Sequence, residues 1–133
     1  MAQTVLTSLD EVRAAVGRHL GTSDWLEITD DRLDRFAAAT GGGDHGHLAL
    51  ALTNLFLPQI MEVRGASLGV NYGTGTIRFP EPLRAGSRVR GTAELVACDD
   101  IAGGVQTTIL ITVEVDGADE PACVVESLSR WLA

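Results

Sequence analysis

Lysine is absent from this chain of 133 residues, and all ten basic residues are arginines. This absence excludes a Schiff base on lysine, the lysine of a phosphate-binding P-loop and a lysine general base. The arginines are outnumbered by 18 aspartates and glutamates, which gives a net charge of −8. Because a protein that binds nucleic acid through its phosphates needs the opposite sign, we expect no nucleic-acid partner.

Cysteine is scarce, and the two thiols, Cys98 and Cys123, match neither a zinc-site spacing nor a redox motif. Each lies in an apolar, strand-like stretch, where free cysteine usually behaves as a small buried hydrophobe. We therefore predict two structural thiols and no metal site.

Long apolar runs are also absent, which excludes an ordinary transmembrane helix. The N-terminal Met-Ala-Gln-Thr-Val lacks the basic and apolar regions of a secretory signal. We therefore expect a cytoplasmic protein without membrane contact. Hydrophobic residues make up 45% of the chain, enough to bury a core, and the length suits one domain over residues 1–133.

The first part of the chain carries helix signals. Ser8 begins a capping box, which predicts a short helix over residues 8–16. A brief strand is expected over residues 24–28. Thr29 is the predicted N-cap of a second helix, which Gly41 ends.

Three consecutive glycines separate these elements from the most apolar segment of the chain, residues 47–57. Hydrophobic residues fill every face of this segment, so we expect a helix that is buried on most sides. Pro58 is expected to end or kink it.

The second half of the chain is predicted to be β-structure, with strands over residues 66–79, 87–97, 105–115 and 122–132. Residues 105–115 give the clearest signal, because apolar and polar side chains alternate there with the period of a strand. The sequence therefore predicts an α+β fold, in which a long antiparallel sheet wraps around one apolar helix.

This order of elements is that of the hotdog fold, and short segments carry a resemblance to one family with that fold. Phe36-Ala-Ala-Ala-Thr-Gly41 resembles the segment that leads into the active site of MaoC-like (R)-specific enoyl-CoA hydratases. His45-Gly-His-Leu-Ala-Leu50 is similar to the start of their central helix. Residues 71–89 and 122–127 resemble the NodN-like branch, and the match runs over roughly residues 20–133.

The resemblance implies hydration or dehydration at C2–C3 of an enoyl or 3-hydroxyacyl thioester, bound to CoA or an acyl carrier protein, without a cofactor. Such chemistry needs acid and base groups on one face of the substrate. The family's aspartate and histidine lie in the loop before the central helix, and Asp44 with His45 or His47 is the candidate remnant of that pair. Gly46 matches the glycine whose N–H binds the enolate-like oxygen. On the competing interpretation, Asp44 is only a helix cap and the histidines are solvated.

The family's loop between Thr-Gly and His-Gly is much longer than Gly41-Gly-Gly-Asp44, the segment found here. A natural loss, an engineered deletion and a segment absent from this sequence all stay open as explanations. Two other functions therefore stay open as well. One is a cyclase or other orientation-driven enzyme of natural-product biosynthesis, acting on a polyketide-like small molecule. The other is a non-catalytic hotdog partner subunit.

Five further residues are candidates for binding substrate. Asn54 lies mid-helix among apolar residues, where an amide either bonds structurally or lines a pocket. Asn71 and Tyr72 either line the substrate tunnel or pack in the sheet. Arg84 and Arg88 are cations that suit CoA phosphates or an acidic carrier, although solvated strand ends explain them equally well.

The predicted sheet also has an edge and an apolar face to cover. One small sheet wrapped on one helix leaves both unpaired in a single chain. We therefore predict a homodimer.

Overall fold

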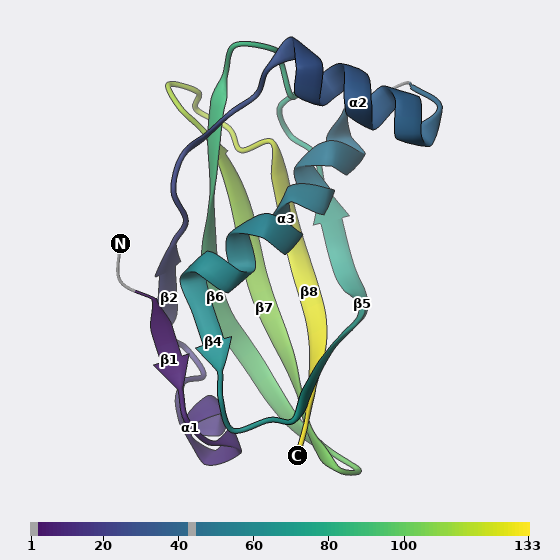
Figure 1. Ribbon diagram of the computed structural model, residues 1–133. Helices are drawn as coiled ribbons and strands as arrows, with labels where there is room; N and C mark the ends of the chain where they lie inside the picture. The colour runs from purple at the N-terminus through teal and green to yellow at the C-terminus, as the bar shows by residue number, and fades with distance from the viewer. Residues whose placement is uncertain (1–2, 43–44) are drawn as a thin grey trace.

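The computed structural model describes residues 3–42 and 45–133 (Figure 1). A strongly bent antiparallel sheet carries the long helix α3 across one of its faces. The elements in chain order are β1 (Thr4–Leu6), α1 (Leu9–Ala14), β2 (His19–Thr22), β3 (Leu26–Glu27), α2 (Asp30–Thr40), α3 (Gly46–Ile60), β4 (Met61–Val63), β5 (Leu68–Arg78), β6 (Arg88–Ile101), β7 (Gly104–Val115) and β8 (Cys123–Leu132). The α+β class predicted from the sequence is confirmed.

The sheet is built from the long strands of the second half of the chain. Strand order is β2-β6-β7-β8-β5, with β3 also pairing with β6, so β5 forms one edge. Strands β6, β7 and β8 follow one another in the chain and pair as antiparallel neighbours. Strand β5 precedes β6 in the chain, yet it pairs directly with β8. A separate parallel pair, β1 with β4, ties the start of the chain to the segment that follows α3.

The core lies between α3 and the inner face of the sheet. Alternate residues of β7 are buried, in the pattern that its sequence predicts. Phe56 and Ile60 of α3 are fully buried. Gly91 of β6 lies directly under Phe56: a Cβ atom at position 91 would fall 2.8 Å from the Phe56 Cβ. The absence of a side chain at Gly91 therefore allows the close approach of the helix to the sheet at this point.

Helix α3 differs from its prediction in two respects. Only one face of the helix is buried, and Leu48, Leu52 and Phe56 are among the residues on it, whereas Leu55 is 44% exposed. The prediction of burial on most sides is therefore wrong for the single chain. Pro58 does not end the helix, which continues to Ile60. A proline in the last turn removes one backbone N–H donor, and the helix closes two residues later.

The ends of α2 are where the sequence placed them. The Thr29 hydroxyl accepts a hydrogen bond from the Arg32 N–H at 3.0 Å, and Gly41 adopts the left-handed conformation that ends the helix, with φ of 93°. The strand predicted over residues 24–28 is shorter, because only Leu26–Glu27 pairs with β6. The sequence patterns did not predict β1, β2 or β4.

Candidate active site

The start of α3 brings together the predicted catalytic residues that the structure describes. His45 is the N-cap residue, and its side chain makes no capping hydrogen bond. Gly46 and His47 form the first turn. Asp44 lies outside the described residues, so its predicted role as an acid or base stays a prediction.

The end of β5 packs against this first turn. The His47 ring meets the Phe79 ring edge to face, with the centroids 6.0 Å apart and an interplanar angle of 83°. Gly46 lies against the same ring, since a Cβ at position 46 would fall 3.1 Å from the Phe79 Cδ1. Phe79 thus fixes the position of the α3 N-terminus relative to the edge strand.

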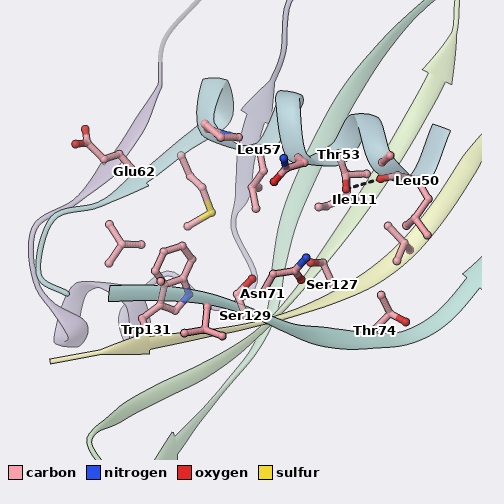
Figure 2. A pocket seen from close by; sticks show the side chains of 18 residues that line it. Leu50, Thr53, Leu57, Glu62, Asn71, Thr74, Ile111, Ser127, Ser129 and Trp131 are labelled. Atoms are coloured by element: carbon pink, nitrogen blue, oxygen red, sulfur yellow. Dashed lines mark hydrogen bonds between the residues drawn. The ribbon is translucent and has the colours of Figure 1, made fainter. Parts of the chain in front are cut away.

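A cavity of about 570 Å³ lies beneath α3, between the helix and strands β5 and β8 (Figure 2). Leu50, Thr53 and Leu57 project from the helix, and Asn71, Ser127 and Trp131 project from the strands below. The complete lining is Leu50, Ala51, Thr53, Asn54, Leu57, Pro58, Met61, Glu62, Val63, Gly69, Val70, Asn71, Thr74, Ile111, Val125, Ser127, Ser129 and Trp131.

The helix side of the cavity continues the face on which His47 lies. Leu50, Ala51 and Asn54 line the cavity and stand three, four and seven positions after His47. Side chains at such spacings share one side of a helix. His47 itself is exposed and does not line the cavity. His47 therefore lies on the same side of α3, three positions nearer the helix N-terminus than Leu50, the first lining residue.

The sheet side of the cavity is set by strand register. Thr74 pairs with Ser127, Asn71 with Ser129, and Gly69 with Trp131. Along β8 toward the C-terminus, two polar pairs are therefore followed by the tryptophan at the end of the cavity. The Trp131 indole N–H donates to the Thr107 hydroxyl at 2.9 Å. This bond and the absence of a side chain at Gly69 hold the indole at the end that is remote from His47.

Two of the five predicted binding residues line this cavity. Asn54 comes from α3 and Asn71 from β5, so the helix and the edge strand each contribute one amide. Tyr72 does not line it. Its ring lies under the Arg130 guanidinium, 3.5 Å from the ring centroid, and Arg130 stands on the sheet face opposite to Ser129.

The two predicted cations also lie away from the cavity. Arg84 pairs with Glu81 at 3.0 Å. Arg88 pairs with Asp116 and lies over the Trp25 ring, 5.2 Å from its centroid. Each of these arginines is thus paired with a nearby carboxylate. That they contact a CoA phosphate stays a prediction, because neither arginine lines the cavity.

The sequence patterns missed Ser127, Ser129 and Trp131 as lining residues. All three stand at alternate positions of β8, on the same face as the buried Val125. Polar residues at inward-facing positions of an apolar strand were the signal that could have found them.

The two cysteines are apart from the cavity lining, as their prediction as structural thiols implies. Cys123 is buried, and burial raises the pKa of its thiol from 9.0 to about 11. Cys98 is half-buried, and desolvation raises its pKa as well. Within residues 3–42 and 45–133, no group of three His, Cys, Asp or Glu side chains is arranged to hold a metal ion.

No helix in the described part of the chain has the length and apolar character needed to cross a membrane.

These elements define a class: an α+β protein whose sheet wraps one helix, with a cavity between that helix and the edge strand. A scan of family models finds no match. The 3-hydroxyacyl-thioester dehydratase Z of Mycobacterium tuberculosis is 39% identical, with 95% of this chain and 97% of the relative aligned. Nodulation protein N of Rhizobium meliloti is 32% identical, over 95% of this chain and 89% of that protein.

Solved structures show the same fold. The R-hydratase of Pseudomonas aeruginosa has a TM-score of 0.68 at 16% identity, covering 88% of this chain and 81% of that one. A MaoC-like dehydratase of Rhodospirillum rubrum has a TM-score of 0.66 at 14% identity, covering 89% and 92%. This chain belongs to the MaoC-like hotdog dehydratase family, as the resemblance in its sequence predicted.

The alignment with dehydratase Z is 146 positions long, which exceeds the 133 residues of this chain. That relative therefore has residues without a counterpart here. That the loop before α3 is the shortened segment stays a prediction.

Proposed function

We propose that this protein is a hydro-lyase that interconverts a 3-hydroxyacyl thioester and its enoyl thioester. The observation that carries the proposal is the 39% identity to a 3-hydroxyacyl-thioester dehydratase along almost the full length of both chains. The cavity beneath α3 supports it, because its helix side lies on the face of α3 that begins with His47 and its volume of about 570 Å³ has room for an acyl group. The thioester carrier, CoA or an acyl carrier protein, is part of the proposal.

The reaction needs one base and one acid. In dehydration a base removes a proton from C2, the electron pair forms the C2–C3 double bond, and the C3 hydroxyl leaves as water after accepting a proton. Hydration is the reverse. Asp44, His45 and His47 are the proposed acid and base residues, since they adjoin the cavity end of α3 in sequence. The positive end of the helix dipole stabilises negative charge there, as the proposed oxyanion role of Gly46 requires.

Hydration of crotonyl-CoA, followed by the loss of enoyl-thioester absorbance, tests the proposal. We expect His47→Ala or Asp44→Asn to lower kcat/KM by about 10²- to 10⁴-fold, which is typical for loss of an acid or base. His45→Ala distinguishes which histidine acts. His19→Ala is the matched control, because His19 is exposed on β2 and does not line the cavity.

Two outcomes separate the parts of this proposal. If the unmodified protein hydrates no enoyl thioester, the proposed activity is wrong. If it does so and Asp44→Asn, His45→Ala and His47→Ala all keep full activity, the activity stands and these residue roles are wrong.

The proposed active form is a homodimer, and its cytoplasmic location also stays a prediction. The long edge strand β5 leaves Leu68 54% exposed and Tyr72 53% exposed, and Leu55 is exposed on α3. An exposed apolar edge is normally covered by another chain. Sedimentation of the purified protein tests this, and a monomer at micromolar concentration would contradict it.

The residues that dehydratase Z has and this chain lacks favour a second candidate. A protein without the acid–base pair could still act by binding and orienting a substrate, as in a cyclase, or serve as a partner subunit. Exchange of the C2 proton with solvent deuterium discriminates, because hydration requires it and orientation alone does not.

A further inference from the structure

We propose that the preferred acyl chain carries a hydroxyl or keto group beyond the reacting C2–C3 atoms. The inference rests on the proposed function and concerns the substrate class of the same cavity. Its basis is a group of polar residues of the cavity lining, here called the polar band, which extends from the Leu50 end of the cavity toward Trp131. The band consists of Asn54 on α3, Asn71 and Thr74 on β5, and Ser127 and Ser129 on β8.

Asn54, the residue that α3 contributes to the polar band, lies too far from the α3 N-terminus to serve the reacting atoms. Asn54 follows His47 by seven positions, and a rise of about 1.5 Å per residue separates them by about 10 Å along the helix axis. A thioester positioned at His47 therefore has its C3 hydroxyl near the first turn. Only a later part of the acyl chain reaches Asn54.

The sheet side of the polar band faces the helix as a compact set. Thr74 pairs with Ser127 and Asn71 pairs with Ser129 in the strand register. Figure 2 shows Asn71 and Ser127 pointing toward the helix from neighbouring strands. Amide and hydroxyl groups from the helix and both strands thus surround one stretch of the cavity.

The groups of the polar band have hydrogen-bonding capacity to spare. Ser129 is only 7% exposed, and in the described residues its hydroxyl has no hydrogen-bond partner, although Thr107 bonds its carbonyl at 3.4 Å. Among the described residues, every side-chain nitrogen or oxygen that is fully removed from the surface has a partner. The Ser129 hydroxyl therefore keeps some exposure, and Ser129 lines the cavity. A hydrocarbon chain there would desolvate polar atoms without bonding them, whereas a substrate hydroxyl or carbonyl would bond them.

Beyond the polar band the cavity becomes largely apolar again. Leu57, Met61, Val63 and the Trp131 ring line this end together with one charged residue, Glu62, whose carboxylate pairs with Arg64 at 3.2 Å. The indole is held in place, since its N–H bonds Thr107 and a Cβ at Gly69 would fall 2.8 Å from its Cζ3. The cavity therefore matches a chain with a polar middle and an apolar end, which is the pattern of an oxygenated, polyketide-type acyl group.

The test compares two enoyl-CoA thioesters of equal chain length, one a plain hydrocarbon and one with a mid-chain hydroxyl. We expect the unmodified protein to favour the hydroxylated substrate by at least about tenfold in kcat/KM, because a site built around polar groups rejects a partner that lacks them. Ser129→Ala and Asn71→Leu should each lower the ratio of the two kcat/KM values, because each raises kcat/KM for the hydrocarbon thioester. Thr108→Val, on the outer face of β7, should leave the ratio unchanged.

Equal kcat/KM for the two substrates, or an unchanged ratio in both variants, overturns the inference. Crotonyl-CoA, which is too short to reach the polar band, tests the proposed activity separately in the same preparations. If no thioester is turned over, the Trp25→Phe protein keeps Trp131 as its one tryptophan, and fluorescence quenching reports binding. Tighter binding of the hydroxylated thioester then supports the ligand class without the activity, and equal binding refutes it.

Discussion

The contact between Phe56 and Gly91 makes a sharp prediction about what holds α3 on the sheet. Gly91→Ala places a new Cβ 2.8 Å from the Phe56 Cβ and 3.0 Å from its Cδ2. Real Cβ atoms do not approach so closely, and Phe56 is fully buried, so the helix or the strand must shift. Overpacking of this kind costs about 1–3 kcal/mol of the free energy of unfolding.

Thermal unfolding followed by far-ultraviolet circular dichroism measures this cost. For a domain of this size, each kcal/mol lowers Tm by about 3–5 °C, so we expect Gly91→Ala to lower Tm by about 3–15 °C. Gly73→Ala is the matched control, because its added Cβ meets nothing within 4 Å. All samples are compared at one protein concentration, since association would shift Tm.

A double-mutant cycle identifies the cause. Phe56→Leu makes space at the contact, so Gly91→Ala should cost about 1 kcal/mol less in the Phe56→Leu protein than in the unmodified one. If Gly91→Ala costs no more than Gly73→Ala, the close approach is not limiting. If its cost is the same with either residue at position 56, the strain does not come from the Phe56 side chain.

Two further predictions concern a buried thiol and the start of α3. Burial raises the pKa of the Cys123 thiol to about 11, so the unfolded chain loses this proton first, and the associated stability is present below about pH 9 and lost as the pH rises toward 11. Urea unfolding across that range should show a shallower loss for Cys123→Ala, and equal slopes would contradict the burial argument. Gly46→Ala brings a Cβ to 3.1 Å from the Phe79 ring, so the ring must move by a few tenths of an ångström. We expect this displacement to lower kcat/KM for crotonyl-CoA hydration about tenfold. Adding Phe79→Leu to the Gly46→Ala protein should restore part of the hydration activity. If none is restored, the loss comes from the change at position 46 and not from its contact with the Phe79 ring.

Local signals predicted much of the fold. Thr29 and Gly41 bound α2 because capping depends on a few neighbouring residues. The alternation over residues 105–115 predicted β7 and its buried face, since strand period depends on the chain alone. The segment after the glycines was predicted to be a helix because leucine and alanine favour helix over strand, and α3 confirms it.

Features that depend on distant residues were not predicted. The pairing of β1 with β4 joins residues far apart in the chain, and three-residue strands carry almost no periodic signal. The apolar residues of α3 predicted burial on most sides, yet sequence hydrophobicity does not distinguish a face covered by the same chain from a face left for a partner.

The candidate site was predicted in part. Asn54 and Asn71 were predicted from residue type and position, and both line the cavity, whereas the catalytic roles of Asp44, His45 and His47 stay predictions. Arg84 and Arg88 were candidates because the sequence does not reveal the carboxylates of Glu81 and Asp116 that pair with them. Such pairing depends on turns and strand register.

The place of α3 in the chain has a consequence for synthesis on the ribosome. The helix ends at Ile60, whereas the strands that cover it, β6, β7 and β8, extend to Leu132. The nascent chain therefore exposes Phe56 and Ile60 until the strands that cover them have been made, and β5 must wait for β8 before its hydrogen bonds can form. Long-range pairing of this kind slows folding and prolongs the period in which apolar surface can bind other chains. Chaperones that bind apolar segments can therefore bind α3 before the sheet has formed.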